Sequence, residues 1–117
     1  WSAQEIAIAA ALSGDDLLWE AYASGDAYIA FAIQAGVAPE GATKASHKAI
    51  RDRCKQVVLG TNYGMTGHGV AEAAGIHVLE ARDLLQRHRD TYRKFWKWAD
   101  ANKDRGLLGL PLETCFG

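Results

Sequence analysis

Residues 51–64 read RDRCKQVVLGTNYG. Within this run Arg51, Lys55, Leu59 and Tyr63 recur at every fourth position, and Gly64 follows. Successive members of such a series drift by only about 40° around an α-helix, so the four side chains form one stripe roughly 18 Å long. The spacing therefore predicts a long helix that carries two cations, an apolar residue and an aromatic residue on a single face.

The order of this stripe matches the layout of a nucleotide. Arg51 and Lys55 can hold phosphates by charge-assisted hydrogen bonds, while Leu59 and Tyr63 can face a sugar and a base. Arg and Lys along one helix face are, however, more often a solvated surface. The spacing alone leaves both interpretations open.

The pattern Arg-x3-Lys-x3-Leu-x3-Tyr-Gly resembles the nucleotide-binding helix in the fingers of family A DNA polymerases, a class that includes bacterial DNA polymerase I and phage replicases. Their third position is usually Phe or Tyr, and Leu59 resembles some phage-type members. The resemblance implies that Arg51 and Lys55 are catalytic and neutralise the β- and γ-phosphates, with Lys55 also protonating the departing pyrophosphate. It also implies that Leu59 packs on the sugar.

The first fifteen residues resemble motif A of the same family. The positions that align without a gap are Trp1, Ser2, Glu5 and 12–15, the last reading LSGD. The resemblance implies that Glu5 packs against the sugar and rejects a 2′-hydroxyl, and that the backbone carbonyl of Trp1 contacts a metal ion. Residues 3–4 and Ala7 depart from the family pattern. Ser2 and Glu5 also fit a capping box that begins a helix.

Further site residues follow from the same resemblance. Tyr28 stands where the family has His or Tyr near the nucleotide phosphates, although core packing accounts for it equally well. Tyr63 and Gly64 resemble the positions that check the template side. Thr66 and His68, in the segment Thr66-Gly67-His68, resemble positions near template DNA.

Four glycines crowd into residues 60–69. They are not followed by the Gly-Lys-Ser or Gly-Lys-Thr of a phosphate-binding P-loop. Gly60 inside a helix costs about 1 kcal/mol relative to Ala. Either the close approach of a base or template strand, or close packing of two helices, would explain this glycine.

The resemblance covers essentially all 117 residues, but these correspond to only part of a polymerase. We expect residues 1–117 to form the fingers subdomain, with a remnant of the palm motif A at the N-terminal end. The resemblance implies that both metal-binding aspartates lie outside this chain, and that Mg²⁺ serves the intact enzyme. Asp15 is interpreted as a helix N-cap rather than a metal ligand. The isolated chain is therefore expected to be inactive.

Composition agrees with one small domain. The formal net charge of −1 hides an asymmetry, because residues 1–43 contain no Lys or Arg while the remainder holds all 13 cations. A basic half is what a phosphate-facing surface requires. The two cysteines give neither a disulfide framework nor zinc spacing; Cys54 falls on the side of its helix away from Arg51 and is predicted to be buried. No apolar run approaches the roughly 20 residues that span a bilayer, and we expect a cytoplasmic protein with no membrane partner.

The expected fold is mainly α, with several short helices, one long nucleotide-binding helix and a short β hairpin or extended segment near the C-terminal end. Glycines and capping residues mark the boundaries: Asp26 is predicted to cap the helix that begins at Ala27, and Gly75 to end the helix that begins at Thr66. Tyr92, Phe95 and Trp96 follow helical spacing and are predicted to be core, whereas Trp98 lies off that face. The first three predicted helices cover about 3–12, the stretch from Asp15 or Asp16 to just before Gly25, and 27–35. The next three cover 44–62, the stretch from Thr66 through Ala74, and 78–103 with a break near Thr91. A hairpin or extended return is predicted over 107–116.

The leading functional hypothesis is therefore part of a DNA-directed DNA polymerase, whose partners are primer–template DNA, deoxynucleoside triphosphates and the remainder of the polymerase chain. A second hypothesis is a phage-type single-subunit RNA polymerase, which Glu5 argues against because such an enzyme must leave room for a 2′-hydroxyl. A third is a non-catalytic helical DNA-binding module with a solvated basic face. That module would bind DNA with a salt dependence but without nucleotide preference.

Overall fold

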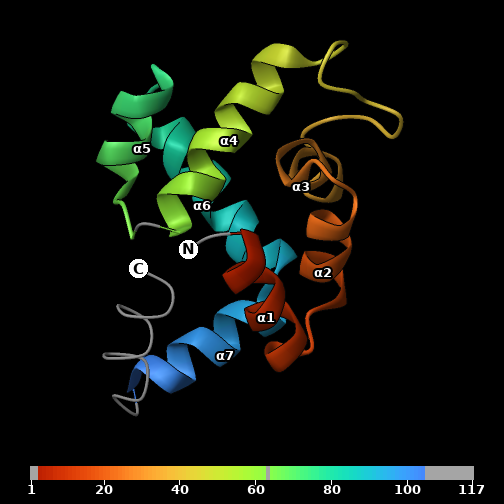
Figure 1. Ribbon diagram of the computed structural model, residues 1–117. Helices are drawn as coiled ribbons and strands as arrows, with labels where there is room; N and C mark the ends of the chain where they lie inside the picture. The colour runs from red at the N-terminus through yellow and green to blue at the C-terminus, as the bar shows by residue number, and fades with distance from the viewer. Residues whose placement is uncertain (1–2, 63, 105–117) are drawn as a thin grey trace.

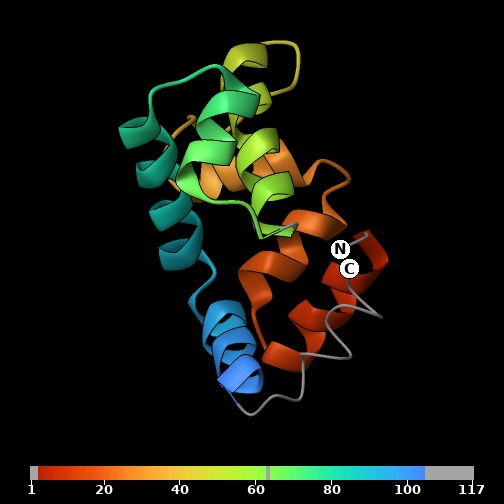
Figure 2. The same cartoon turned by 90° about the vertical axis from the view of Figure 1, so that its left-hand side faces the viewer.

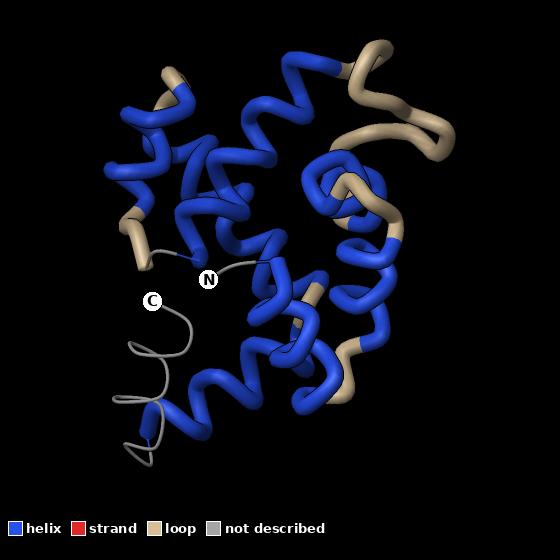
Figure 3. Tube along the Cα trace, in the orientation of Figure 1, coloured by secondary structure: helices blue, strands red, loops and turns tan. Residues whose placement is uncertain are grey.

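The computed structural model describes the backbone of residues 3–62 and 64–104, and the side chains of residues 6–61 and 64–101. Within these residues the chain forms helices and no strands (Figures 1 and 3). The helices are α1 (Ala3–Ser13), α2 (Asp16–Ala23), α3 (Ala27–Gln34), α4 (Lys48–Asn62), α5 (Gly67–Ala74), α6 (Val78–Thr91) and α7 (Arg93–Asp104). The mainly α prediction is confirmed, and the predicted hairpin over 107–116 lies outside the described residues.

The predicted capping residues begin and end the helices where expected. Asp15 Oδ1 accepts a hydrogen bond from the Leu18 amide at the start of α2. Asp26 begins α3, and Thr66 begins α5 by accepting from the Gly69 amide. Gly75 ends α5 with φ +69, a left-handed conformation that glycine adopts without a steric penalty. Local capping chemistry thus sets most of the helix boundaries.

The long helix begins later than the sequence indicated. Regular helix begins at Lys48 rather than at about Lys44. The preceding residues form a turn in which Ser46 Oγ accepts from the Thr43 amide at 2.8 Å and Thr43 Oγ1 accepts from the Ser46 amide at 3.1 Å. Ser and Thr side chains compete for backbone groups in this way and favour turns over helix interiors. Here they hold the chain in a turn for four residues before α4.

Helix α4 lies at the centre of the fold, between α3 on one side and the α5–α6 pair on the other (Figure 1). Its buried face carries Cys54, Val57 and Val58, as predicted for Cys54. Burial raises the pKa of the Cys54 thiol to about 11, so this thiol stays protonated at neutral pH. Arg51 and Lys55 lie beside this face rather than opposite it, and both are partly buried.

Helices α1 and α7 pack together at the end of the molecule away from α5 (Figure 2). The chain breaks between α6 and α7 at Tyr92, close to the predicted position at Thr91, and Tyr92 itself is buried. Asp15, also buried, spans this junction: its Oδ2 accepts from the Phe95 amide in the first turn of α7 at 3.0 Å. One carboxylate therefore caps α2 and also holds the start of α7.

A buried histidine completes the core at this junction. The ring centre of His88 lies 5.1 Å from that of Phe31 and 4.9 Å from that of Tyr92. His88 Nδ1 accepts a hydrogen bond from Trp96 Nε1 at 3.0 Å, because an indole nitrogen can only donate. In its neutral form the imidazole therefore carries its proton on Nε2. Burial, with a smaller contribution from the charge of Arg89, lowers the pKa of His88 to about 3.

The predicted core position of the aromatic stripe is confirmed for Tyr92 and Phe95, which are buried, while Trp96 is half-buried. Trp98 is half-buried and packs against the same core. None of the described helices is both long enough and apolar enough to cross a bilayer.

Candidate functional site

The first half of α4 brings its two cations to the same aromatic ring. The guanidinium carbon of Arg51 lies 5.2 Å from the centre of the Tyr28 ring, and Lys55 Nζ lies 6.0 Å from it. Both distances are within the range of cation–π attraction. Tyr28 stands in the first turn of α3, and all three side chains are only partly buried. Two cations and one aromatic ring therefore come together where α3 meets α4.

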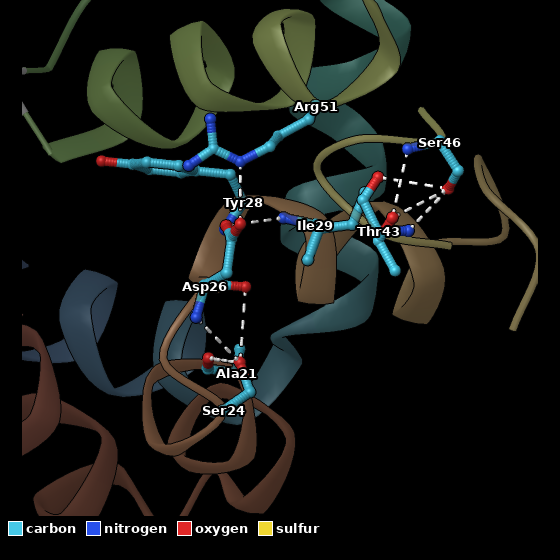
Figure 4. Close-up of polar contacts among 8 residues, drawn as sticks. All are labelled: Ala21, Ser24, Asp26, Tyr28, Ile29, Thr43, Ser46 and Arg51. Atoms are coloured by element: carbon cyan, nitrogen blue, oxygen red, sulfur yellow. Dashed lines mark hydrogen bonds and ion pairs between the residues drawn. The ribbon is translucent and has the colours of Figure 1, made fainter. Parts of the chain in front are cut away.

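Arg51 is also ion-paired across the two helices. Its Nε donates to Asp26 Oδ2 at 2.8 Å, and Figure 4 shows this bond beside the Tyr28 ring. The other oxygen of Asp26 accepts from the amides of Tyr28 and Ile29, each at 3.2 Å. The sequence predicted Asp26 only as the N-cap of α3. Its pairing with Arg51 was missed, because no spacing rule connects residues 25 positions apart in two different helices.

The surroundings of Asp26 stabilise its negative charge. Partial burial acts to raise the pKa of this carboxyl, but the hydrogen bond and charge of Arg51, together with the amides of Ile29 and Tyr28, outweigh it and lower the pKa below the usual value. The carboxylate is therefore ionised at neutral pH. Arg51 thus has a permanent counter-ion on one edge of its guanidinium.

The second half of α4 is built by close helix packing. A Cβ placed on Gly60 would lie 2.5 Å from Cγ2 of Val70, a buried side chain of α5. No side chain larger than hydrogen fits there without movement of the core. Of the two explanations that the sequence left open for Gly60, the helix packing is the one seen. Leu59, one turn beyond Lys55, is half-buried.

The turn after α4 contains the residues expected near a template. Gly64 has φ +68, and Met65 donates its amide to the Gly60 carbonyl at 2.8 Å. The hydroxyl of Thr66 is used to begin α5, and His68 in the first turn of that helix is exposed. This turn therefore presents His68 to solvent, whereas Thr66 has a local structural role.

The remaining predicted site residues cannot be placed by their side chains. Glu5 lies on α1, but its side chain is outside the described residues, as are Trp1 and Tyr63. Where side chains are described, no group of three or more His, Cys, Asp or Glu is arranged to hold a metal ion. The structure thus places Arg51, Lys55 and Tyr28 close together. The side-chain positions of Glu5, Trp1 and Tyr63 stay predictions.

The whole chain, residues 1–117, matches the family model described as DNA polymerase family A. Among curated proteins it is similar to a thermostable DNA polymerase I of Thermus thermophilus, with 29% identity over 119 residues that cover 100% of this chain and 14% of that relative. A thermostable DNA polymerase I of Thermus filiformis is 29% identical over 68 residues, which cover 58% of this chain and 8% of the relative. The chain thus spans only a small part of the relatives that it matches. No solved structure gives a significant match.

Proposed function

The chain belongs to DNA polymerase family A, and from that premise we propose that residues 1–117 are the fingers of a DNA-directed DNA polymerase with a remnant of palm motif A at the N-terminal end. In this proposal the chain binds the incoming deoxynucleoside triphosphate and the template strand during DNA replication or repair. Primer–template DNA and the remainder of the polymerase chain are its partners. Family membership supports a nucleotidyltransferase as the parent enzyme.

The observation that carries the proposal is the convergence of Arg51 and Lys55 on Tyr28. Two cations on one side of α4, next to a partly exposed aromatic ring, form a site that a triphosphate can approach. There Arg51 and Lys55 neutralise the β- and γ-phosphates. The two cations stabilise the negative charge that develops on the leaving pyrophosphate, and they do so most strongly in the transition state. Lys55 donates the proton that the pyrophosphate takes up as it departs.

The rest of the stripe extends the same proposal toward the sugar and base. Leu59 packs on the sugar, and Glu5 excludes a 2′-hydroxyl. Tyr63 and Gly64 check the template side, with His68 near template DNA. Thr66 supports this end of the site by beginning α5.

Among the described side chains, no group of three or more His, Cys, Asp or Glu is arranged to hold a Mg²⁺ ion by itself. The proposal therefore assigns Mg²⁺ to parts of a polymerase other than these residues. The roles proposed for Arg51 and Lys55 depend on their own charges and hydrogen bonds.

Replacing Lys55 by Ala in a polymerase that carries this chain should lower turnover by about 100-fold, the usual effect of removing one preorganised group that stabilises transition-state charge. The affinity for primer–template DNA should change by less than about threefold, because one phosphate contact among many contributes little to it. Single-turnover primer extension and a DNA-binding titration measure the two quantities. Lys48→Ala, at an exposed position of the same helix, is the matched control. Equal losses of turnover and DNA affinity would contradict the assignment.

The isolated 117 residues should not extend a primer. Phosphoryl transfer of this kind uses two metal ions that stabilise the attacking and leaving oxygens, and the described side chains form no such site. A primer-extension assay with the chain alone, with Mg²⁺ and all four deoxynucleotides, tests this. Template-dependent extension by the pure chain would refute it.

A further inference from the structure

We propose that Asp26 is a positioning residue for the incoming nucleotide: it holds Arg51 by one edge of the guanidinium, so that the opposite edge is presented to the triphosphate. This inference rests on the proposed function, because it takes Arg51 to be a phosphate ligand. It adds a residue that makes no phosphate contact itself, on a different helix from the cations.

The two oxygens of Asp26 have different partners. Oδ1 accepts from the amides of Tyr28 and Ile29, which fixes the carboxylate to the first turn of α3. Oδ2 accepts from Arg51 Nε at 2.8 Å. Figure 4 shows both sets of bonds meeting at this one side chain. Because the first oxygen is held by the backbone, the second is a fixed acceptor, and Arg51 is thereby tied to the start of α3.

This contact uses only the inner edge of the guanidinium. Nε lies next to the aliphatic stem, and no described residue accepts a hydrogen bond from Nη1 or Nη2. Those two terminal nitrogens form the planar fork that binds phosphate oxygens in pairs. Tyr28 lies against the same group, with its ring centre 5.2 Å from the guanidinium carbon. Asp26 thus fixes the position of the group, and Tyr28 limits its tilt.

The pair is shielded enough to keep this geometry. The Arg51 and Asp26 side chains are 15% and 26% exposed, whereas those of Arg53 and Glu80, paired from the same helix α4 to α6, are 48% and 44% exposed. Exposed ion pairs are screened by water and hold their partners weakly. The lowered pKa of Asp26 agrees with a carboxylate that stays charged beside Arg51.

An arginine that is ordered before the nucleotide arrives loses less side-chain freedom on binding. Lys55 Nζ borders the same Tyr28 ring at 6.0 Å, so a phosphate near that ring can meet the ordered fork and the ammonium together. The consequence concerns nucleotide affinity. Asp26 should lower the KM for deoxynucleotides and leave the chemical step largely unaffected.

Asp26→Asn separates the two roles of this side chain. Asparagine is as good an N-cap as aspartate, so its carbonyl can keep the start of α3, but its amide group cannot accept from Arg51 Nε in place of Oδ2. In a full polymerase that carries this chain, we expect Asp26→Asn to raise the deoxynucleotide KM by about tenfold, as expected for the loss of a hydrogen bond between charged groups. We expect kcat to stay within about twofold. In the Arg51→Ala background the same substitution should have no further effect.

Glu80→Gln is the matched control, because it breaks the Arg53 pair on the same helix α4 and should leave KM unchanged. A lower KM in Asp26→Asn would overturn the inference, since it would make Asp26 a competitor of the phosphates. An unchanged KM in Asp26→Asn together with a raised KM in Arg51→Ala would overturn the inference alone and leave the proposed function standing. An unchanged KM in Arg51→Ala would overturn both.

Discussion

Asp15→Ala should lower the free energy of unfolding by about 4 kcal/mol, because hydrogen bonds to a charged partner contribute roughly 1.5–3 kcal/mol each and this substitution removes two. Oδ1 accepts from the Leu18 amide at 3.1 Å and Oδ2 from the Phe95 amide at 3.0 Å. Both bonds are buried, so water cannot readily replace the lost acceptor. Urea unfolding of the 117-residue chain, followed by far-ultraviolet circular dichroism, measures the change.

Asp16→Ala is the control for Asp15→Ala. Asp16 is exposed in the first turn of α2, where its charge interacts with the helix dipole, and its loss should lower the free energy of unfolding by less than about 1 kcal/mol. Asp15→Asn should lower the free energy of unfolding by less than Asp15→Ala and by more than Asp16→Ala, because the single amide oxygen of asparagine can accept well from only one of the two backbone amides. Equal effects of Asp15→Ala and Asp16→Ala would show that the bond to α7 contributes nothing.

Acid should destabilise the fold through the protonation of His88. The unfolded imidazole takes up a proton below its ordinary pKa of 6.5, whereas the buried ring resists protonation down to a pKa of about 3. The stability held by the neutral ring is therefore complete above pH 6.5 and declines as the pH falls. Linkage gives a loss of about 3 kcal/mol between pH 7.5 and pH 4.5. Asp26, whose pKa is lowered, contributes to acid sensitivity only below this window.

Urea unfolding at pH 7.5 and pH 4.5 compares the chain with its His88→Gln variant. Glutamine does not titrate, and its oxygen can still accept from Trp96 Nε1. In this variant the free energy of unfolding should therefore differ much less between pH 7.5 and pH 4.5, by most of that 3 kcal/mol. His68→Gln, at an exposed position, should retain the full difference. An undiminished difference in His88→Gln would exclude the buried imidazole as its cause.

The fold was largely predictable because short-range chemistry sets its boundaries. Asp26 begins α3, Gly75 ends α5 and the chain breaks one residue after Thr91, all from signals within a few residues of each boundary. The error at the start of α4 has a related cause. Thr43 and Ser46 bind one another's backbone amides, and helical periodicity alone does not distinguish such a turn from a first helical turn.

The candidate site was predictable only where its residues share one helix. Spacing was enough to put Arg51 and Lys55 on one side of α4, because helix geometry relates positions four residues apart. The contribution of α3 required the packing of two helices. The pair of Asp26 with Arg51, like the burial of His88, depends on contacts between distant segments, and local sequence patterns carry no information about these. The roles of Glu5, Tyr63 and the other nucleotide- and template-binding residues stay predictions.

The double use of Asp15 also has a consequence for the order in which the chain folds. Its bond to the Phe95 amide joins residues 80 positions apart. Closing a loop of this size carries a length-dependent entropic penalty of about 4 kcal/mol, more than a single hydrogen bond returns. The bond therefore forms only after neighbouring helices have already brought the two ends of this loop together. We therefore expect the junction of α1, α2 and α7 to form late in folding, and damage to it to accelerate unfolding more than it slows folding.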